Sequence, residues 1–174
     1  GYKAFYLAIG ASRGTPVGCP GDDLEGVCTG IDFLRDLNTG KKPDIGRAVA
    51  VIGGGNVSVD VARTAVRLGA EKVYLVYRRG RDEIKADDEE VGEAVAEGVE
   101  LKLLRAPVEI TGKDGKVSSI KLEIMELGEA DASGRRAPVG TGKYETLEVS
   151  AVIGAIGQKV DMGGIEKGAM TFAK

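Results

Sequence analysis

The sequence predicts an α/β fold with a central parallel β-sheet, and two observations carry this prediction. Short apolar runs alternate with helical segments in the order βαβα as far as Gly98, the pattern of parallel strands joined by crossover helices. Beyond Gly98 the pattern changes to strand pairs around Asp114-Gly115, a strong hairpin signal. We therefore expect helices on one face of the parallel sheet and an antiparallel β-meander on the other.

Each expected element has its own local signal. The helices carry apolar residues at helical spacing and stop at glycine: residues 31–40, 56–69 and 87–98. The strands are apolar runs bounded by turn residues: residues 3–11, 46–52, 72–79 and 147–158, with the hairpin between residues 99 and 127. The stretch 128–146 is polar and rich in glycine, so we expect an exposed connection there.

Composition limits the classes of protein that this chain could be. Its 174 residues are 43% hydrophobic and 29% charged, enough for one ordinary core. No apolar run is long enough to span a membrane and no signal-peptide pattern begins the sequence, so we predict a cytoplasmic protein. The net charge of −3 comes from interspersed acids and bases, which does not indicate a nucleic-acid surface or partner.

The glycines after the second strand indicate a dinucleotide-binding turn. Gly53, Gly55 and Ser58 fit the pattern G-x-G-x-x-small, after a strand and at the start of a helix, the context that gives this weak motif its meaning. Gly53 would allow the tight turn, and Gly55 would let a pyrophosphate approach the backbone. We expect Asn56 to be the N-cap; a glycine-rich turn without a ligand is the alternative. The predicted binding residues here are Gly53, Gly54, Gly55, Asn56, Val57 and Ser58.

Two arginines predict which dinucleotide is bound. NAD-binding folds place an acidic residue at the end of the next strand, where it holds the ribose 2′-hydroxyl. This sequence has Arg78 and Arg79 at that place, and guanidinium groups suit the 2′-phosphate of NADP. We therefore predict NADPH as the ligand. The alternative is a solvated basic strand end, with the arginines paired to Asp82 or Glu83.

Catalytic side chains are not expected in this chain. It contains no His, which excludes Ser-His and Cys-His catalysis. Cys19 and Cys28 are too far apart for a CxxC pair and lack further Cys or His ligands for zinc. We interpret both cysteines as structural and predict neither a catalytic residue nor a metal site.

Motifs across nearly the whole chain resemble a known family. The stretches "YKAFYLAIGAS", "VAVIGGGNVSVDVARTAVRLGAEKVYLVYRR", "MELGEADASGRRAPV" and "AVIGAIGQ" are similar to the NADPH-dependent glutamate synthase small subunit. They also resemble dihydropyrimidine dehydrogenase and ferredoxin:NADP oxidoreductases with two dinucleotide-binding domains, of the pyridine nucleotide-disulfide oxidoreductase type. The resemblance implies a Rossmann-like FAD/NAD(P)-binding domain.

The resemblance also implies a domain organisation. In that group the NADP domain is inserted into an FAD domain, and the chain crosses between them at two Ala-Ile-Gly motifs. Both motifs are present, ending at Gly10 and Gly157, and the family places Ile156 and Gly157 near the nicotinamide. Residues 1–45 would return from the FAD domain, 46–150 would form the NADP-binding domain, and 151–174 would re-enter the FAD domain.

Several functions stay open at this point. The first is a fragment that binds NADPH within a flavin-dependent oxidoreductase, which passes hydride to FAD and on to an iron-sulfur centre or an electron-accepting partner subunit. The family's FAD motifs and cysteine-rich segment are absent from this sequence, so FAD and 4Fe-4S clusters would belong to the longer parent. The alternatives are a ferredoxin- or pyrimidine-reducing relative, a non-catalytic NADP(H)-binding regulator, and a free-standing dehydrogenase. Against the dehydrogenase, the sequence offers no Tyr-x-x-x-Lys pair and no substrate lobe.

Overall fold

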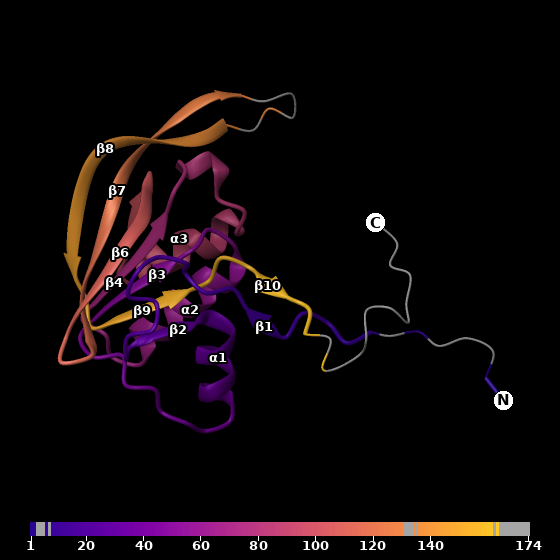
Figure 1. Cartoon of the computed structure of the whole chain (residues 1–174). Coiled ribbons are helices and arrows are strands. Elements are labelled where there is room, and N and C mark those ends of the chain that lie inside the picture. Colours follow the sequence, from indigo (N-terminus) through magenta and orange to yellow (C-terminus); the bar gives the residue numbers. More distant parts are fainter. Residues whose placement is uncertain (3–5, 7, 131–133, 135, 162, 164–174) are drawn as a thin grey trace.

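A five-stranded parallel sheet forms the centre of the fold (Figure 1). The computed structural model describes residues 1–2, 6, 8–130, 134, 136–161 and 163. In spatial order the strands are β2 (Val27–Thr29), β9 (Ala151–Gly154), β3 (Ala48–Ile52), β4 (Lys72–Tyr77) and β5 (Val99–Leu103). Every neighbouring pair is parallel. The α/β prediction is thus confirmed.

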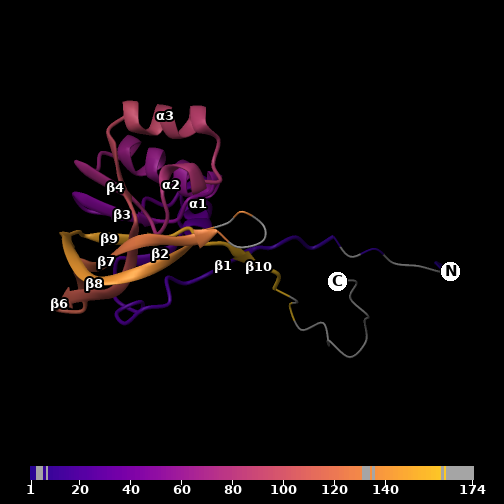
Figure 2. The same ribbon diagram turned by 90° about the horizontal axis from the view of Figure 1, so that it is seen from above.

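Three helices cover one face of this sheet (Figure 2). They are α1 (Gly30–Asn38), α2 (Asn56–Arg67) and α3 (Asp88–Ala96). Successive residues of a strand point to opposite faces, so Val49 and Val51 pack in the core under the helices, whereas Ala50 and Ile52 belong to the core on the other face. All four are buried, which explains why β3 is apolar throughout rather than alternating.

An antiparallel sheet covers the opposite face, as the sequence predicts. It consists of β6 (Arg105–Lys113), β7 (Lys116–Ala130) and β8 (Arg136–Glu148). Asp114 and Gly115 form the predicted hairpin turn with φ angles of 54° and 81°, the left-handed conformation that a two-residue turn of this kind needs. Ile120 and Leu122 on β7 pack against the parallel sheet.

The prediction of an exposed connection over residues 128–146 is wrong. β7 extends to Ala130, and β8 begins at Arg136 and pairs with β7. β8 is the outer strand of its sheet and is exposed along most of its length. An edge strand with one solvated face needs few apolar residues. The polar sequence of β8 therefore did not indicate a strand.

The predicted strand over residues 3–11 is not present where the structure describes that segment. Residues 3–5 and 7 lie outside the described part, and Tyr6 and residues 8–11 belong to no strand. Instead, β1 (Arg13–Gly14) pairs antiparallel with β10 (Gln158–Lys159) in a two-stranded ribbon (Figure 1). An extended apolar segment becomes a strand only where a neighbouring strand accepts its hydrogen bonds.

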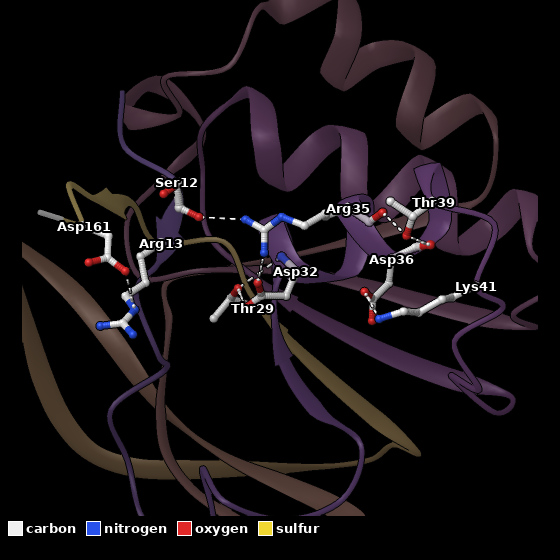
Figure 3. Close-up of polar contacts among 9 residues, drawn as sticks. All are labelled: Ser12, Arg13, Thr29, Asp32, Arg35, Asp36, Thr39, Lys41 and Asp161. Carbon is white, nitrogen blue, oxygen red and sulfur yellow. Dashed lines mark hydrogen bonds and ion pairs between the residues drawn. The ribbon is translucent and has the colours of Figure 1, made fainter. Parts of the chain in front are cut away.

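Polar contacts fasten this ribbon to α1 (Figure 3). Thr29 caps α1, since its hydroxyl oxygen accepts a bond from the amide of Asp32. Arg35 pairs with Asp32 at 2.6 Å and donates to the carbonyl of Ser12 at 2.7 Å. A Cβ on Gly14 would lie 2.3 Å from the Thr29 hydroxyl oxygen, so glycine is required for this close approach. The ribbon therefore has a fixed place beside the helix.

No helix among the described residues is long and apolar enough to cross a membrane.

Candidate functional site

A cavity of about 670 Å³ opens at the carboxyl ends of the parallel strands, the usual place for a ligand in such a sheet. The β3–α2 turn, the end of β4, the start of β6 and the segment after β9 line it. Most predicted site residues meet there: Gly53, Gly54, Gly55, Asn56, Val57, Arg78, Arg79, Ile156 and Gly157. Ser58 lies below the turn, where it is fully buried.

Two of the glycines are required by their protein neighbours. Gly53 has a φ of +154°, and a Cβ there would lie 2.4 Å from the carbonyl oxygen of Ala155. Glycine therefore lets the turn pass close to the segment after β9. A Cβ on Gly54 would lie 2.6 Å from two carbons of the Tyr77 ring. At these two positions, glycine is therefore required by contacts within the protein and not by a ligand.

Gly55 differs, because a Cβ built there meets nothing within 4 Å. Its φ of −114° and ψ of 174° are open to any residue, so neither packing nor backbone strain explains the glycine. Gly55 lies on the wall of the cavity. The space that a side chain would fill is therefore available to a ligand that approaches the backbone.

Helix α2 presents its amino terminus at the same wall. Asn56 is not the N-cap, contrary to the prediction: Gly55 is the N-cap, Asn56 is the first helical residue, and no side chain caps the helix. The first amides of a helix have no partner within it, and they carry partial positive charge. Ser58 instead donates its hydroxyl to the carbonyl of Gly55 at 2.5 Å. If the Asn56 side chain capped the helix, it would accept a hydrogen bond from one of the first amides. Without such a cap, that amide is available to an anion.

Cationic side chains line the cavity on the β4 side. Arg78 is exposed, whereas Arg79 is 8% exposed and its Nε is buried without a hydrogen-bond partner. In the part of the chain that the structure describes, neither arginine forms an ion pair with Asp82 or Glu83. The alternative of a strand end neutralised by these acids is therefore not observed.

Two further cations that the sequence did not predict line the cavity, Lys85 and Arg105. Lys85 follows the 3₁₀ turn η1 (Arg81–Glu83) and is exposed. Arg105 begins β6 and donates to Glu145 at 2.7 Å, and Glu145 also pairs with Lys102. The bond from Arg105 lowers the pKa of Glu145. No sequence motif indicates these residues, because long-range packing brings them to the cavity.

Ile156 and Gly157 form the wall after β9. The amide of Ala155 donates to the carbonyl of Ile52 at 2.8 Å, and the carbonyl of Gly157 accepts from the amide of Thr15 at 3.0 Å. Gly157 has a φ of +133°, which a residue with a side chain rarely adopts. This segment is thereby fixed between β3 and the ribbon.

The two cysteines are free and are not among the residues that line the cavity. Cys28 packs against the core under the helices, and Cys19 packs against the core between the sheets. Burial raises the pKa of Cys28 to about 11, and the charges of Asp32 and Asp36 act in the same direction. A thiol with this pKa is protonated near neutral pH and is a poor nucleophile.

The cavity thus combines an uncapped helix terminus and the backbone of Gly55 with Arg78, Arg79 and Lys85, which have no ion-pair partner within the described part of the chain. Such an arrangement binds an extended anionic ligand. Its described lining can bind and orient such a ligand.

Comparisons with known proteins identify the family of this chain. A family model described as pyridine nucleotide-disulphide oxidoreductase matches residues 1–173. The chain is 42% identical over 169 residues to NADP(+)-dependent formate dehydrogenase subunit beta of Moorella thermoacetica, covering 95% of this chain and 24% of that protein. It is 36% identical over 170 residues to the glutamate synthase (NADPH) small chain of Escherichia coli K12, covering 90% of this chain and 36% of the relative.

Two solved structures are similar in fold to this chain. FprA from Mycobacterium tuberculosis in complex with NADPH superimposes with a TM-score of 0.76 and 26% identity, covering 90% of this chain and 50% of FprA. Thioredoxin reductase from Giardia duodenalis has a TM-score of 0.62 at 25% identity, covering 84% of this chain and 41% of the reductase. The chain spans only part of each of these proteins. Together, the family match and the relatives show that the chain belongs to the pyridine nucleotide-disulphide oxidoreductase family.

Proposed function

We propose that this chain is the NADPH-binding domain of a flavin-dependent oxidoreductase. One observation carries the proposal: Gly55 opens onto a cavity at the uncapped start of α2, with the unpaired Arg78 and Arg79 on the same cavity. The helix start fits a pyrophosphate and the arginines fit a second phosphate. Relatives named for NADPH or NADP(+), and a neighbour solved with NADPH, support the proposal.

Each part of the site has a proposed role in holding the dinucleotide. The backbone of Gly54 and Gly55 and the first amides of α2 bind the pyrophosphate. Arg78, Arg79 and Lys85 bind the 2′-phosphate. The nicotinamide end would lie toward Ile156 and Gly157, as the sequence resemblance implies.

The chemistry comes from the cofactors, since NADPH when bound supplies a hydride that FAD can accept. Residues of this chain bind and orient the donor. The unpartnered Nε of Arg79 supports this role, because a buried guanidinium nitrogen without an acceptor is costly unless a ligand supplies one.

We propose that the FAD site lies in a further domain, joined through the β1–β10 ribbon. The two strands run side by side, and Arg13 pairs with Asp161 across them at 3.7 Å. The expected division at residues 45 and 150 separates β2 and β9 from a sheet to which both belong. We therefore propose that the boundaries of the NADP-binding domain lie at this ribbon.

The acceptor is proposed to depend on other domains or subunits. The relatives share the matched segment but are named for different acceptors and substrates, among them formate, Fe(3+) and glutamate. A glutamate synthase-like route through 4Fe-4S clusters to a partner subunit stays a prediction, as does the cytoplasmic location.

Titration of the purified chain with NADPH and NADH tests the proposal. NADPH should bind at least about tenfold more tightly, the equivalent of one charge-assisted phosphate contact. Arg79→Gln should abolish most of this preference. Arg47→Gln is the matched control, because Arg47 pairs with Glu71 beyond the opposite end of β3.

Two results would contradict the proposal. Equal affinity for the two dinucleotides would refute the role of the arginines, and turnover of a simple alcohol with NADP alone would favour a free-standing dehydrogenase. In a protein that joins this chain to an FAD domain, NADPH binding without reduction of FAD would favour the regulatory alternative.

A further inference from the structure

Glu83 is largely buried and packs against Gly80, the residue that follows the arginine pair. Its side chain is 13% exposed, and its Oε2 is buried without a hydrogen-bond partner. A Cβ built on Gly80 would lie 2.8 Å from that oxygen, and Gly80 directly follows Arg79. The carboxylate is therefore packed against the backbone at the end of β4.

Contacts of the segment around Glu83 with Tyr77 and Gly54 hold this residue in place. The hydroxyl of Tyr77 donates to its backbone carbonyl at 2.8 Å, and the Tyr77 ring packs against Gly54. Two residues after Glu83, the amide of Lys85 bonds to the carbonyl of Gly54. Glu83 is thus part of the segment docked on the glycine turn.

A partly buried carboxylate at this point opposes the binding of a phosphate. It would attract Arg78 or Arg79, since charges attract more strongly away from bulk water, and an arginine paired with it could not serve an incoming 2′-phosphate. Its own charge would also repel the phosphate. Sequence distance alone makes Glu83 an obvious partner for these arginines.

Arg136 forms an ion pair with the Glu83 carboxylate instead. It lies 53 residues away on β8, and both its Nε and its Nη2 donate to Oε1 of Glu83, the first at 2.9 Å. Arg79 keeps a buried Nε with no partner. An arginine from the antiparallel sheet thus neutralises an acid that packs against Gly80, directly after the two arginines that follow β4.

We propose that Arg136 is a specificity-determining positioning residue for NADPH. By holding the Glu83 carboxylate, it keeps Arg78 and Arg79 available to the 2′-phosphate, although Arg136 itself is not among the residues that line the cavity. This inference rests on the proposed function, because it needs those arginines to bind that phosphate.

The test compares Arg136→Gln, Glu83→Gln and the double variant by titration with NADPH and NADH. Arg136→Gln should raise the Kd for NADPH about tenfold, the loss of one charge-assisted contact, and leave the Kd for NADH nearly unchanged. The double variant should restore NADPH affinity to near that of the wild type, because the released carboxylate is then absent. Arg47→Gln breaks an arginine–glutamate pair at the far end of the sheet and should change neither Kd.

A purely structural role for Arg136 would give different results. Arg136→Gln would then lower the melting temperature and weaken the binding of NADPH and NADH equally, and adding Glu83→Gln would not restore binding. Either that result or an unchanged Kd for NADPH would overturn the inference. Arg79→Gln separates this failure from failure of the proposed function. If Arg79→Gln removes the NADPH preference and Arg136→Gln does not, only the inference about Arg136 fails.

Discussion

The carbonyl oxygen of Gly54 accepts hydrogen bonds from the amides of both Lys85 and Ala86, at 2.7 and 3.2 Å. These bonds dock the segment after η1 onto the glycine turn. They place Lys85 on the cavity through its backbone, so the position of this residue does not depend on its side-chain charge.

Removal of the Lys85 charge should therefore weaken phosphate binding without disturbing the turn. In Lys85→Gln the backbone bonds to Gly54 remain, and the Kd for NADPH should rise about three- to tenfold, as expected for one partly solvated charge contact. The Kd for NADH should change less, because NADH has no 2′-phosphate. Calorimetric titration measures both; Lys72→Gln, at the start of β4, is the control. An equal loss for both dinucleotides would place Lys85 elsewhere in the site.

A methyl group on Gly55 should impair binding but not folding. Nothing lies within 4 Å of its Cβ position and its backbone angles suit alanine, so Gly55→Ala should change the free energy of unfolding by less than about 1 kcal/mol. The methyl group would occupy the space proposed for the pyrophosphate and weaken NADPH binding at least about tenfold. Gly92→Ala also meets no neighbour, but it lies on α3 and should leave binding unaffected. Wild-type affinity in Gly55→Ala would refute the proposed pyrophosphate contact.

Gly54→Ala should instead destabilise the protein. Its Cβ would lie 2.6 Å from the Tyr77 ring, an overlap that costs about 1–3 kcal/mol when the ring has to move. Urea unfolding measures this loss relative to the wild type. In the Tyr77→Ala background the same substitution should cost less, since the clashing ring is absent; an equal cost in both backgrounds would show that the ring is not the cause.

The stability of the protein should fall at alkaline pH through Cys28. Its pKa is raised from 9.0 to about 11 by burial, so the unfolded chain loses this proton at a lower pH than the folded one. The contribution to stability is complete below pH 9 and is lost as the pH rises towards 11. The free energy of unfolding of Cys28→Ala should decline less over this interval than that of the wild type. Identical slopes would mean that Cys28 is more accessible to water than its packing implies.

The sequence predicted the fold class and most of the lining of the candidate site because local patterns encode both. The apolar run of β3 and the glycines after it identify a strand, a turn and a helix within a few residues. Arg78 and Arg79 are adjacent to a strand that could also be recognised locally. Lys85 and Arg105 escaped prediction because their place depends on how η1 and β6 pack against the parallel sheet, for which no local pattern exists.

Local patterns were misleading where burial is one-sided or absent. The polar residues of β8 resemble a loop because the strand is a solvated edge. The apolar segment around Tyr6 resembles a strand, but its described residues find no strand partner. Asn56 is a favourable N-cap residue by composition, yet the helix begins at Asn56 itself, one residue earlier than that role requires.

The sequence by itself determined the α/β class, the family and a glycine turn followed by two arginines, because hydrophobic periodicity and short motifs are local properties. The tertiary structure decided which charged side chains form ion pairs with one another. Glu83 is near the arginines in the sequence, but Arg136, from β8 of the antiparallel sheet, binds its carboxylate. Ion pairs form between groups that are near in space, so only the folded chain could show that Arg78 and Arg79 have no ion-pair partner among the residues that the structure describes.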